Sequence, residues 1–360
     1  MPFKPKFTIT PKVNKGLVEI ERVRGFLDAI KLKDEWFADM QKEALILETH
    51  YSTHIEGTEL SLEQAKGILE GKDVKGVKPD DKKELLNYKK AMGFISRYLG
   101  KEDPIVEGLI RELHKILVKG VRGNQADPGN YRKVQNYVVN SRTREVIYTP
   151  PPPLEVPYLM KEFAEWLNTT EDLSPILIAG ISQFQFVHIH PFLDGNGRTA
   201  RLLSTLILYK TGYDFKRLFT ISEYYDKDRS AYYKAIQSVR QNNMDMTSWL
   251  EYFVDGLRTQ MTGIHEKGKN IIIAENFVKG LKDYNFSIRQ GKIFKYLVIN
   301  GSIDNEQCQK LCGSIKRTAT RDLSSLVGKG ILEKKGEKKG TYYILSSYTV
   351  GKIRDIKGHN

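Results

Sequence analysis

The chain is poor in cysteine, with only Cys308 and Cys312 among its 360 residues. Two cysteines cannot build the disulfide framework of a small secreted protein, so we expect a reducing, cytoplasmic location. The two residues are four positions apart, which would suit a metal pair on one face of a helix. No second pair lies nearby to complete such a site, and they are better explained as small core residues.

Long apolar runs are also absent. The longest stretches, such as residues 175–181, are far shorter than the roughly 20 residues of a membrane-spanning helix, so no membrane association is expected. The start of the chain is basic but lacks the apolar segment of a secretory signal. With 40% hydrophobic and 28% charged residues, the composition is that of a globular protein.

Acidic residues are fewer than basic ones, and the formal net charge is +13. Much of the excess lies in residues 285–360, which contain 15 Lys or Arg but only 6 Asp or Glu. A basic module at one end of a chain suggests a polyanionic partner. A basic surface that serves only solubility is the alternative.

Helical periodicity dominates the chain, which predicts a mainly α-helical fold. Residues 134–149 differ, because they alternate and are rich in Val, Ile and Tyr, and they predict a β-hairpin. After residue 285, three short helices over 288–299, 304–311 and 315–327 precede two strands. That order predicts a C-terminal winged helix-turn-helix domain.

Residues 188–198 read HIHPFLDGNGR and end where a helix is predicted to begin. Glycines let backbone N–H groups approach a ligand, and the free N–H groups at a helix start bind anions. Arg198 and Arg201 are three positions apart and share one face of that helix. A polyphosphate suits this set, although a helix cap with a tight turn also explains the glycines. The GxxxxGK[ST] pattern of a P-loop does not occur.

Asp194 is a hard oxygen ligand, and Mg²⁺ typically takes one or two carboxylates together with phosphate and water. His190 is a candidate general base. A zinc site formed by His188, His190 and Asp194 is the alternative, since catalytic zinc usually has three protein ligands. Zinc would leave Arg198 and Arg201 without a role, so we interpret His188 as a hydrogen-bonded scaffold residue.

Residues 190–201, HPFLDGNGRTAR, resemble the HxFx[D/E]GNGRxxR signature of the Fic (Fido) family. Residues 128–132 and 148–152 resemble the ends of the hairpin "flap" of that family. Residues 222–233 resemble the segment that follows the motif helix in that family, but Asp228 stands where asparagine is expected. The resemblance covers about residues 40–260 and implies a helical Fic-type core with a β-hairpin flap.

The resemblance implies nucleotidyl transfer, because most Fic enzymes move AMP from ATP to a Ser, Thr or Tyr hydroxyl of a protein. It implies that His190 is the base and that Asp194 holds Mg²⁺. The remaining motif residues would bind the phosphates; they are Gly195, Asn196, Gly197, Arg198 and, for the γ-phosphate, Arg201. The implied function is a protein adenylyltransferase that uses ATP and Mg²⁺ and acts on a target protein or on itself.

A second class of function stays open beside the enzyme. The chain would then be a DNA-binding regulator whose Fic core senses a nucleotide, or an enzyme that transfers another phosphate-containing group. The presence of His190 favours transfer chemistry, because a sensor does not need a base.

The flap of a Fic enzyme is expected to align the target segment by β-strand addition. The residues assigned to this docking are Val134, Tyr137, Val139, Ile147 and Tyr148. A plain surface hairpin is the alternative.

Residues 52–57, STHIEG, by themselves look like a helix end with a glycine cap. Beside a Fic core they resemble the inhibitory [S/T]xxxE[G/N] motif, here formed by Ser52, Glu56 and Gly57. The resemblance implies that Glu56 pairs with Arg201 and competes with the γ-phosphate of ATP, so the enzyme would be autoinhibited.

Three domains are therefore expected. Residues 1–110 form an N-terminal helical region with the inhibitory helix at about 40–57, residues 111–284 form the Fic core, and residues 285–360 form the winged helix. In the last domain, basic side chains of the third helix and of the wing are expected to contact double-stranded DNA. They are Lys316, Arg317, Arg321, Lys334, Lys335, Lys338 and Lys339. Winged helices also bind proteins or form homodimers, and both alternatives stay open.

Overall fold

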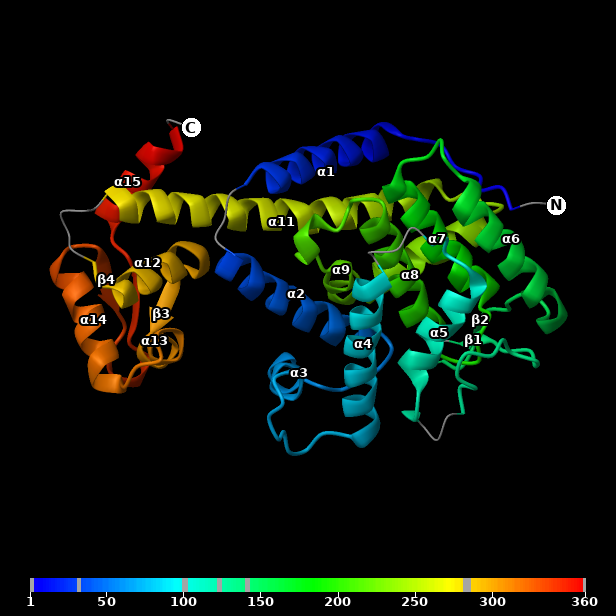
Figure 1. Cartoon of the computed structure of the whole chain (residues 1–360), viewed down its shortest axis with the longest axis horizontal. Coiled ribbons are helices and arrows are strands. Elements are labelled where there is room, and N and C mark those ends of the chain that lie inside the picture. The colour runs from blue at the N-terminus through cyan, green and yellow to red at the C-terminus, as the bar shows by residue number, and fades with distance from the viewer. Residues whose placement is uncertain are drawn as a thin grey trace. The chain divides into compact units, whose positions relative to one another are not determined.

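The structure is a computed structural model that describes residues 3–30, 34–98, 103–121, 125–139, 143–280 and 286–358. The chain forms two compact units, Met1–Thr262 and Gly263–Asn360, and each is described by itself (Figure 1). The boundary falls within one long helix, α11 (Thr247–Gly280). The domain limits expected at residues 110 and 284 stay predictions.

The described part of unit 1 begins with five helices, and two of them start at clear caps. The hydroxyl of Thr10 accepts the N–H of Val13 at the start of α1 (Pro11–Ala29), where proline takes the first position. Ser61 and Gln64 form a capping box at the start of α3 (Leu62–Leu69). The others are α2 (Asp34–Ile55), α4 (Pro79–Tyr98) and α5 (Glu107–Val118).

The core of unit 1 is built around α7 (Pro175–Ile189) and α8 (Asn196–Lys210). The sequence of α7 is apolar on every side, which is typical of a helix surrounded by protein, and nearly all of its residues are buried. α11 packs closely on it, because Trp249 donates its indole N–H to the carbonyl of Gly180 at 2.7 Å. The loop that joins α7 to α8 carries the HIHPFLDGNGR motif.

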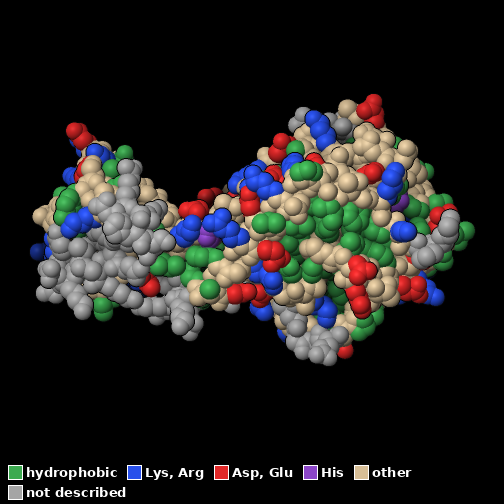
Figure 2. All heavy atoms as spheres, turned by 90° about the horizontal axis from the view of Figure 1, so that it is seen from above, with side chains coloured by type: hydrophobic (Ala, Val, Ile, Leu, Met, Phe, Trp, Pro, Cys, Tyr) green, Lys and Arg blue, Asp and Glu red, His purple; other side chains and the backbone are tan. Residues whose placement is uncertain are grey.

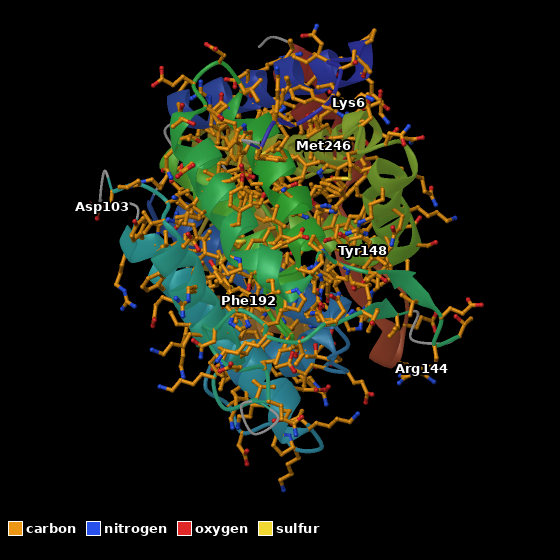
Figure 3. All side chains as sticks on the ribbon, turned by 90° about the vertical axis from the view of Figure 1, so that its right-hand side faces the viewer. Lys6, Asp103, Arg144, Tyr148, Phe192 and Met246 are labelled. Carbon is orange, nitrogen blue, oxygen red and sulfur yellow. The ribbon has the colours of Figure 1, made fainter. Side chains whose placement is uncertain are left out.

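The remaining elements of unit 1 surround this pair. They are η2 (Pro153–Glu155), α6 (Val156–Thr169), η3 (Phe215–Arg217), α9 (Ile221–Lys227) and α10 (Arg229–Gln241). The N-terminal segment is fastened to the start of α11, since the carbonyl of Lys6 accepts the N–H of Met246 at 2.8 Å (Figure 3). α2 packs against both α4 and α9, so it lies within the helical body.

The expected hairpin over 134–149 is present but much shorter than predicted. Only β1 (Val138–Val139) and β2 (Val146–Tyr148) pair, antiparallel and with a register shift between Val138 and Val139. Residues 140–142, where the turn was expected, lie outside the described residues. Val134 was assigned to the hairpin, but it precedes β1. The neighbouring side chains of Gln135 and Asn136 bond to backbone carbonyls of the loops beside them.

Unit 2 has its own apolar core, formed by residues such as Phe294, Leu323 and Tyr343. Its helices are α12 (Ile288–Asn300), α13 (Asn305–Cys312), α14 (Lys316–Gly328) and α15 (Ser347–Gly358). Its strands, with the 3₁₀ turn η5 (Lys338–Gly340) between the last two, are β3 (Ser302–Asp304), β4 (Leu332–Lys335) and β5 (Tyr342–Leu345). The antiparallel sheet has the order β3-β5-β4. The sequence did not predict β3 or α15.

The surface of unit 1 is mixed in charge. Figure 2 shows Lys and Arg side chains interspersed with Asp and Glu over the face in view, with apolar side chains between them. Within the described ranges, no helix is both long enough and apolar enough to cross a membrane.

Candidate active site

The loop between α7 and α8 is fixed by an aromatic stack. Phe192 is fully buried, and its ring lies parallel to that of His114 from α5, with 3.6 Å between the ring centroids. The Nε2–H of His114 donates to the carbonyl of Asp194 at 2.9 Å, and its Nδ1 accepts the N–H of Gly129 at 3.0 Å. Both ring nitrogens are thereby assigned, and burial lowers the pKa of His114 to about 4, so the ring is neutral. No local pattern in the sequence indicates a role for His114.

Asn196 closes the same loop. Its Oδ1 accepts the N–H of Phe192 at 2.9 Å, and its Nδ2 donates to the carbonyl of Phe192 at 2.8 Å. The sequence assigned Asn196 to phosphate binding, but both ends of its amide contact the loop backbone. Its observed contacts therefore shape the loop that would surround a ligand.

Two glycines allow close approach at the start of α8. Gly195 has φ +78°, and a Cβ there would lie 2.9 Å from the side chain of Val118. At Gly197, a Cβ would lie 2.2 Å from Oε1 of Glu56. The carboxylate of Glu56 therefore rests directly on the first turn of α8, where a helix N-terminus attracts negative charge.

Arg201 forms an ion pair with Glu56, the contact that the family resemblance implied. Its Nη2 donates to Oε1 of Glu56 and to the carbonyl of Ser52, each at 2.8 Å, and its Nε donates to Oγ of Ser52 at 2.8 Å. Burial by itself would lower the pKa of Arg201, yet the Glu56 carboxylate raises it above its ordinary value. The guanidinium is thus a charged group held inside the protein.

Arg198 has a partner that the sequence did not reveal. Its guanidinium is 1% exposed and forms a buried ion pair with Glu84 of α4. Its Nη2 also lies 3.5 Å from both carboxylate oxygens of Asp194. Arg198 therefore joins α4 to the motif, and its charge is already shared between two carboxylates.

His190 ends α7 in a left-handed conformation, with φ +52° and ψ +55°. Its Nδ1 lies 3.3 Å from the carbonyl of Val187, which can only accept a proton, so Nδ1 carries the hydrogen and Nε2 keeps its lone pair. Burial, together with Arg240 and Arg132, lowers the pKa of His190 to about 4. At neutral pH the ring is therefore a free base.

His188 has a structural environment. Its Nδ1 lies 2.8 Å from the hydroxyl of Tyr148, which also donates to the His188 carbonyl at 2.8 Å. Tyr148 thus turns toward α7, and its hydroxyl is not free for a target. Among the described residues, no group of three or more His, Cys, Asp or Glu side chains is arranged to hold a metal ion.

Comparisons with known proteins agree with this geometry. Residues 104–208 match the sequence model of the Fic/DOC family. That part of the chain is therefore similar to a Fic domain. It is 34% identical over 202 residues to "Protein adenylyltransferase Fic" of Drosophila grimshawi and 34% identical over 203 residues to the protein of that name from Culex quinquefasciatus. Each match covers 55% of this chain, but only 40% and 39% of the respective relative, so this chain spans less than half of their length.

A solved structure shares the fold over nearly the whole chain. The crystal structure of a Fic family protein from Desulfovibrio desulfuricans G20 has a TM-score of 0.64 and 22% identity, and the match covers 96% of this chain and 99% of that one. Fic-1 (residues 134–508) from C. elegans has a TM-score of 0.58 and 24% identity, over 69% of this chain and 71% of that one. At these identities the likeness concerns the fold.

A polar cluster that the sequence did not predict also holds α2. Nδ1 of His54 lies 2.9 Å from Oδ2 of Asp226 on α9 and 2.6 Å from Nη2 of Arg229 on α10. One helical turn earlier on α2, the ring of His50 stacks on that of His54. We call His54, Asp226 and Arg229 the α2 latch, because they join the end of α2, which precedes Glu56, to α9 and α10.

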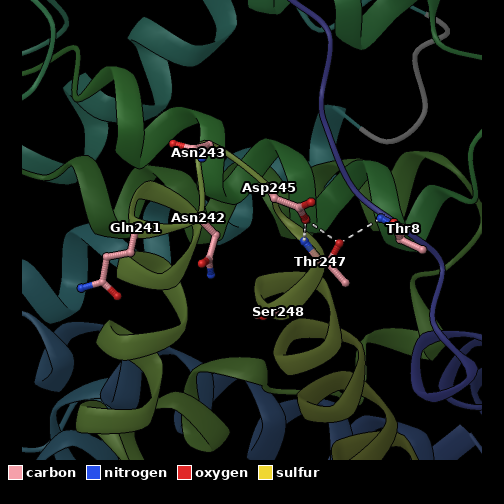
Figure 4. A pocket seen from close by; sticks show the side chains of 7 residues that line it. All are labelled: Thr8, Gln241, Asn242, Asn243, Asp245, Thr247 and Ser248. Carbon is pink, nitrogen blue, oxygen red and sulfur yellow. Dashed lines mark hydrogen bonds between the residues drawn. The ribbon is translucent and has the colours of Figure 1, made fainter.

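A separate pocket of about 450 Å³ is lined by none of the motif residues 188–198 (Figure 4). The N–H of Thr8 donates to Oγ1 of Thr247, whose hydroxyl in turn donates to Asp245. Three of the polar residues that line the pocket are thus engaged with one another. The full lining is Thr8, Gln241, Asn242, Asn243, Asp245, Thr247 and Ser248.

Proposed function

We propose that this protein is an adenylyltransferase that moves AMP from ATP to a hydroxyl group of a protein, and that Glu56 holds it in an inhibited form. The contact between the carboxylate of Glu56, the guanidinium of Arg201 and the start of α8 carries the proposal. A carboxylate at that position imitates the anion that the site would bind. The relatives named protein adenylyltransferase support the same activity.

The reaction needs a base, and His190 supplies one. In the proposed step, the hydroxyl oxygen of the target attacks the α-phosphorus of ATP and loses its proton to Nε2 of His190. The bond between the α-phosphorus and the bridging oxygen breaks, and pyrophosphate leaves. The backbone N–H groups at the start of α8 and the side chain of Arg201 would stabilise the negative charge of the phosphates.

Inhibition follows from competition for Arg201. The γ-phosphate of ATP and the Glu56 carboxylate would require the same guanidinium, which is fully buried and cannot serve both. The oxygens of Ser52 contact the same guanidinium, so the whole STHIEG segment contributes. ATP would therefore bind productively only after the end of α2 has moved.

The residues also fit a Mg²⁺ ion that arrives with the nucleotide. The side chain of Asp194 is 40% exposed, which leaves it accessible for such an ion. A single carboxylate does not make a protein site, but it suits Mg²⁺ that takes its other ligands from phosphate and water. Bound there, the ion would neutralise phosphate charge.

The hairpin would align the target protein. Val139 and Ile147 are exposed on β1 and β2, and Tyr137 is exposed just before β1. We propose that a target strand pairs beside them. Tyr148 would take no direct part, since its hydroxyl binds His188, and Val134 would contribute from the exposed loop before β1.

The proposed activity is tested by comparing Glu56→Gly with the wild type after incubation with ATP labelled at the α-phosphorus, Mg²⁺ and a cell extract. We expect Glu56→Gly to label protein much faster than the wild type, and intact mass to show the addition of AMP. Glu59→Gly removes an exposed glutamate just after the same motif and is the matched control. Transfer by Glu56→Gly no faster than by the wild type or Glu59→Gly would overturn the proposal.

We propose further that unit 2 is a winged helix that binds double-stranded DNA. On α14, Lys316, Arg317 and Arg321 are exposed on the side opposite the buried Ala319 and Leu323. Lys334, Lys335 and Lys338 are exposed in and beside the wing, and the side chain of Lys339 lies outside the described residues.

Cys308 and Cys312 are both free thiols, which supports a cytoplasmic location.

A further inference from the structure

Arg240 of α10 is a cation in an unusual position beside the motif. Among the described residues no carboxylate pairs with it; its Nη1 donates to Oε1 of Gln237 at 3.1 Å, and its Nε is buried without a hydrogen-bond partner. Burial lowers its pKa to about 10. Its guanidinium lies over the ring of Tyr148, 3.5 Å from the ring centroid. Burying a cation without an ion-pair partner is costly, so we expect Arg240 to have a specific role beside the motif.

Arg240 contacts both the surroundings of the candidate base, His190, and the hairpin residue Tyr148. Its Nη2 donates to the carbonyl of Val187 at 3.4 Å, and the same carbonyl accepts Nδ1–H of His190 at 3.3 Å. Through the aromatic contact, Arg240 also seats Tyr148, whose hydroxyl bonds the carbonyl of His188. Tyr148 lies at the base of the hairpin and Arg144 lies farther out, away from the helical body (Figure 3).

On the basis of the function proposed above, we infer that Arg240 is a positioning residue. Its contact with Tyr148 keeps β2 packed against the end of α7. Its hydrogen bond to the Val187 carbonyl keeps that carbonyl in place, and the carbonyl in turn fixes the tautomer of His190. Arg240 thereby couples the position of the hairpin, which would align the target, to the orientation of Nε2 of His190. Without Arg240, the carbonyl and the base would both gain freedom, and transfer would slow while nucleotide binding persisted.

The charge of Arg240 also acts on His190 directly. His190 faces Arg240 from α10 and Arg132 from the loop before β1, both of which lower its pKa. Glu56, just after α2, raises it, and the largest effect is burial. Removal of Arg240 therefore leaves His190 easier to protonate, so the acidic limb of a pH–rate profile moves to higher pH.

The test compares Arg240→Gln and Arg240→Lys in the Glu56→Gly protein, with Arg258→Gln as a matched control for the loss of an arginine elsewhere in unit 1. We expect Arg240→Gln to lower kcat by about tenfold to a hundredfold with the Kd for ATP within about twofold. Its acidic limb should move to higher pH. Arg240→Lys should keep the limb in place and recover part of kcat, and Arg258→Gln should match the parent.

NMR titration of the histidine ring nitrogens provides a readout that does not require transfer. In Arg240→Gln, the His190 resonance should titrate at higher pH and lose its single Nδ1–H tautomer. If Glu56→Gly proves inactive, the proposed function fails, yet this titration still tests Arg240. An unchanged His190 titration, or equal loss of ATP binding and kcat in both Arg240 variants, would overturn the inference.

Discussion

Arg198 and Glu84 form an ion pair that is closed off from solvent, although the two residues are 114 positions apart in the chain. The pair fastens α4 to the start of α8, the helix that carries the proposed anion site. Because Asp194 lies at the outer side of the same guanidinium, the position of Glu84 also affects the residue proposed to meet Mg²⁺.

Loss of the Glu84 charge should therefore destabilise the fold. Glu84→Gln keeps the side-chain shape but leaves a buried guanidinium with one distant carboxylate, and breaking a buried pair typically costs about 3–5 kcal/mol. We expect a fall of that order in the free energy of unfolding, measured in urea. Glu112→Gln, at an exposed site on α5, should change it by less than about 0.5 kcal/mol. Equal stability of the two variants would contradict the structural role.

The α2 latch should contribute to inhibition. In Asp226→Asn, the carboxylate that holds His54 and Arg229 is lost, so the last turn of α2 should move more freely and release Glu56 more often. We expect basal AMP transfer to rise, but less than in Glu56→Gly.

The double variant Glu56→Gly/Asp226→Asn discriminates between mechanisms. If the latch acts through Glu56, the double variant should transfer AMP no faster than Glu56→Gly does, because the two effects are not additive. Lys227→Ala, at an exposed site on α9, should leave the basal rate unchanged. If the two substitutions accelerated AMP transfer additively, Asp226 would act independently of Glu56.

Gly197→Ala should show that the anion approaches the backbone of α8 closely. The added Cβ would lie in the position of the Glu56 carboxylate, so the variant should disrupt the inhibitory contact. It should also obstruct phosphate, and the double variant Glu56→Gly/Gly197→Ala should bind ATP much more weakly than Glu56→Gly in calorimetry. If the double variant bound ATP as tightly as Glu56→Gly does, the phosphates would not bind beside Gly197.

Stability should fall on acidification because of buried neutral histidines. The pKa of His114 in the folded protein is about 4, below its ordinary value near 6.5, so the unfolded chain binds more protons between these pH values. Its stabilising contribution is complete above pH 6.5 and is lost as pH falls toward 4, by a total on the order of 3 kcal/mol.

Denaturant unfolding at pH 7.5, 6 and 5 measures this loss. His114→Gln should be less stable at pH 7.5 and should lose less further stability on acidification than the wild type. An identical pH dependence in wild type and variant would exclude His114 as a source of the acid sensitivity.

DNA binding by the full chain should depend steeply on salt. If the six described cations of α14 and the wing each contact a phosphate, affinity for a duplex should fall by about a thousandfold between 50 and 200 mM salt. Arg321→Ala should reduce the slope by about one contact. Absence of binding at low salt in fluorescence anisotropy would exclude DNA, and concentration-dependent self-association would favour the dimer alternative.

The residues that the sequence could predict are those whose signal is local. The motif from His190 to Arg201 is contiguous, and the Glu56–Arg201 pair follows from a second short motif. Glu84, His114 and Arg240 could not be predicted in the same way, because each meets the motif only through packing of distant helices. The hairpin was overestimated for a related reason: a run of Val and Tyr predicts strands, but Gln135 and Asn136 bond to neighbouring loops instead.

Because Glu56 and Arg201 belong to one chain, a nucleotide must compete with a tethered carboxylate for Arg201. A tethered group has an effective concentration at its partner, about millimolar even with a short flexible link, that dilution does not change. The Glu56 carboxylate reaches Arg201 from a helix end that packs within the protein, so little motion separates the two groups. Under the proposed function, raising the ATP concentration is thus an inefficient way to activate transfer, and an event that shifts the end of α2 is an efficient one.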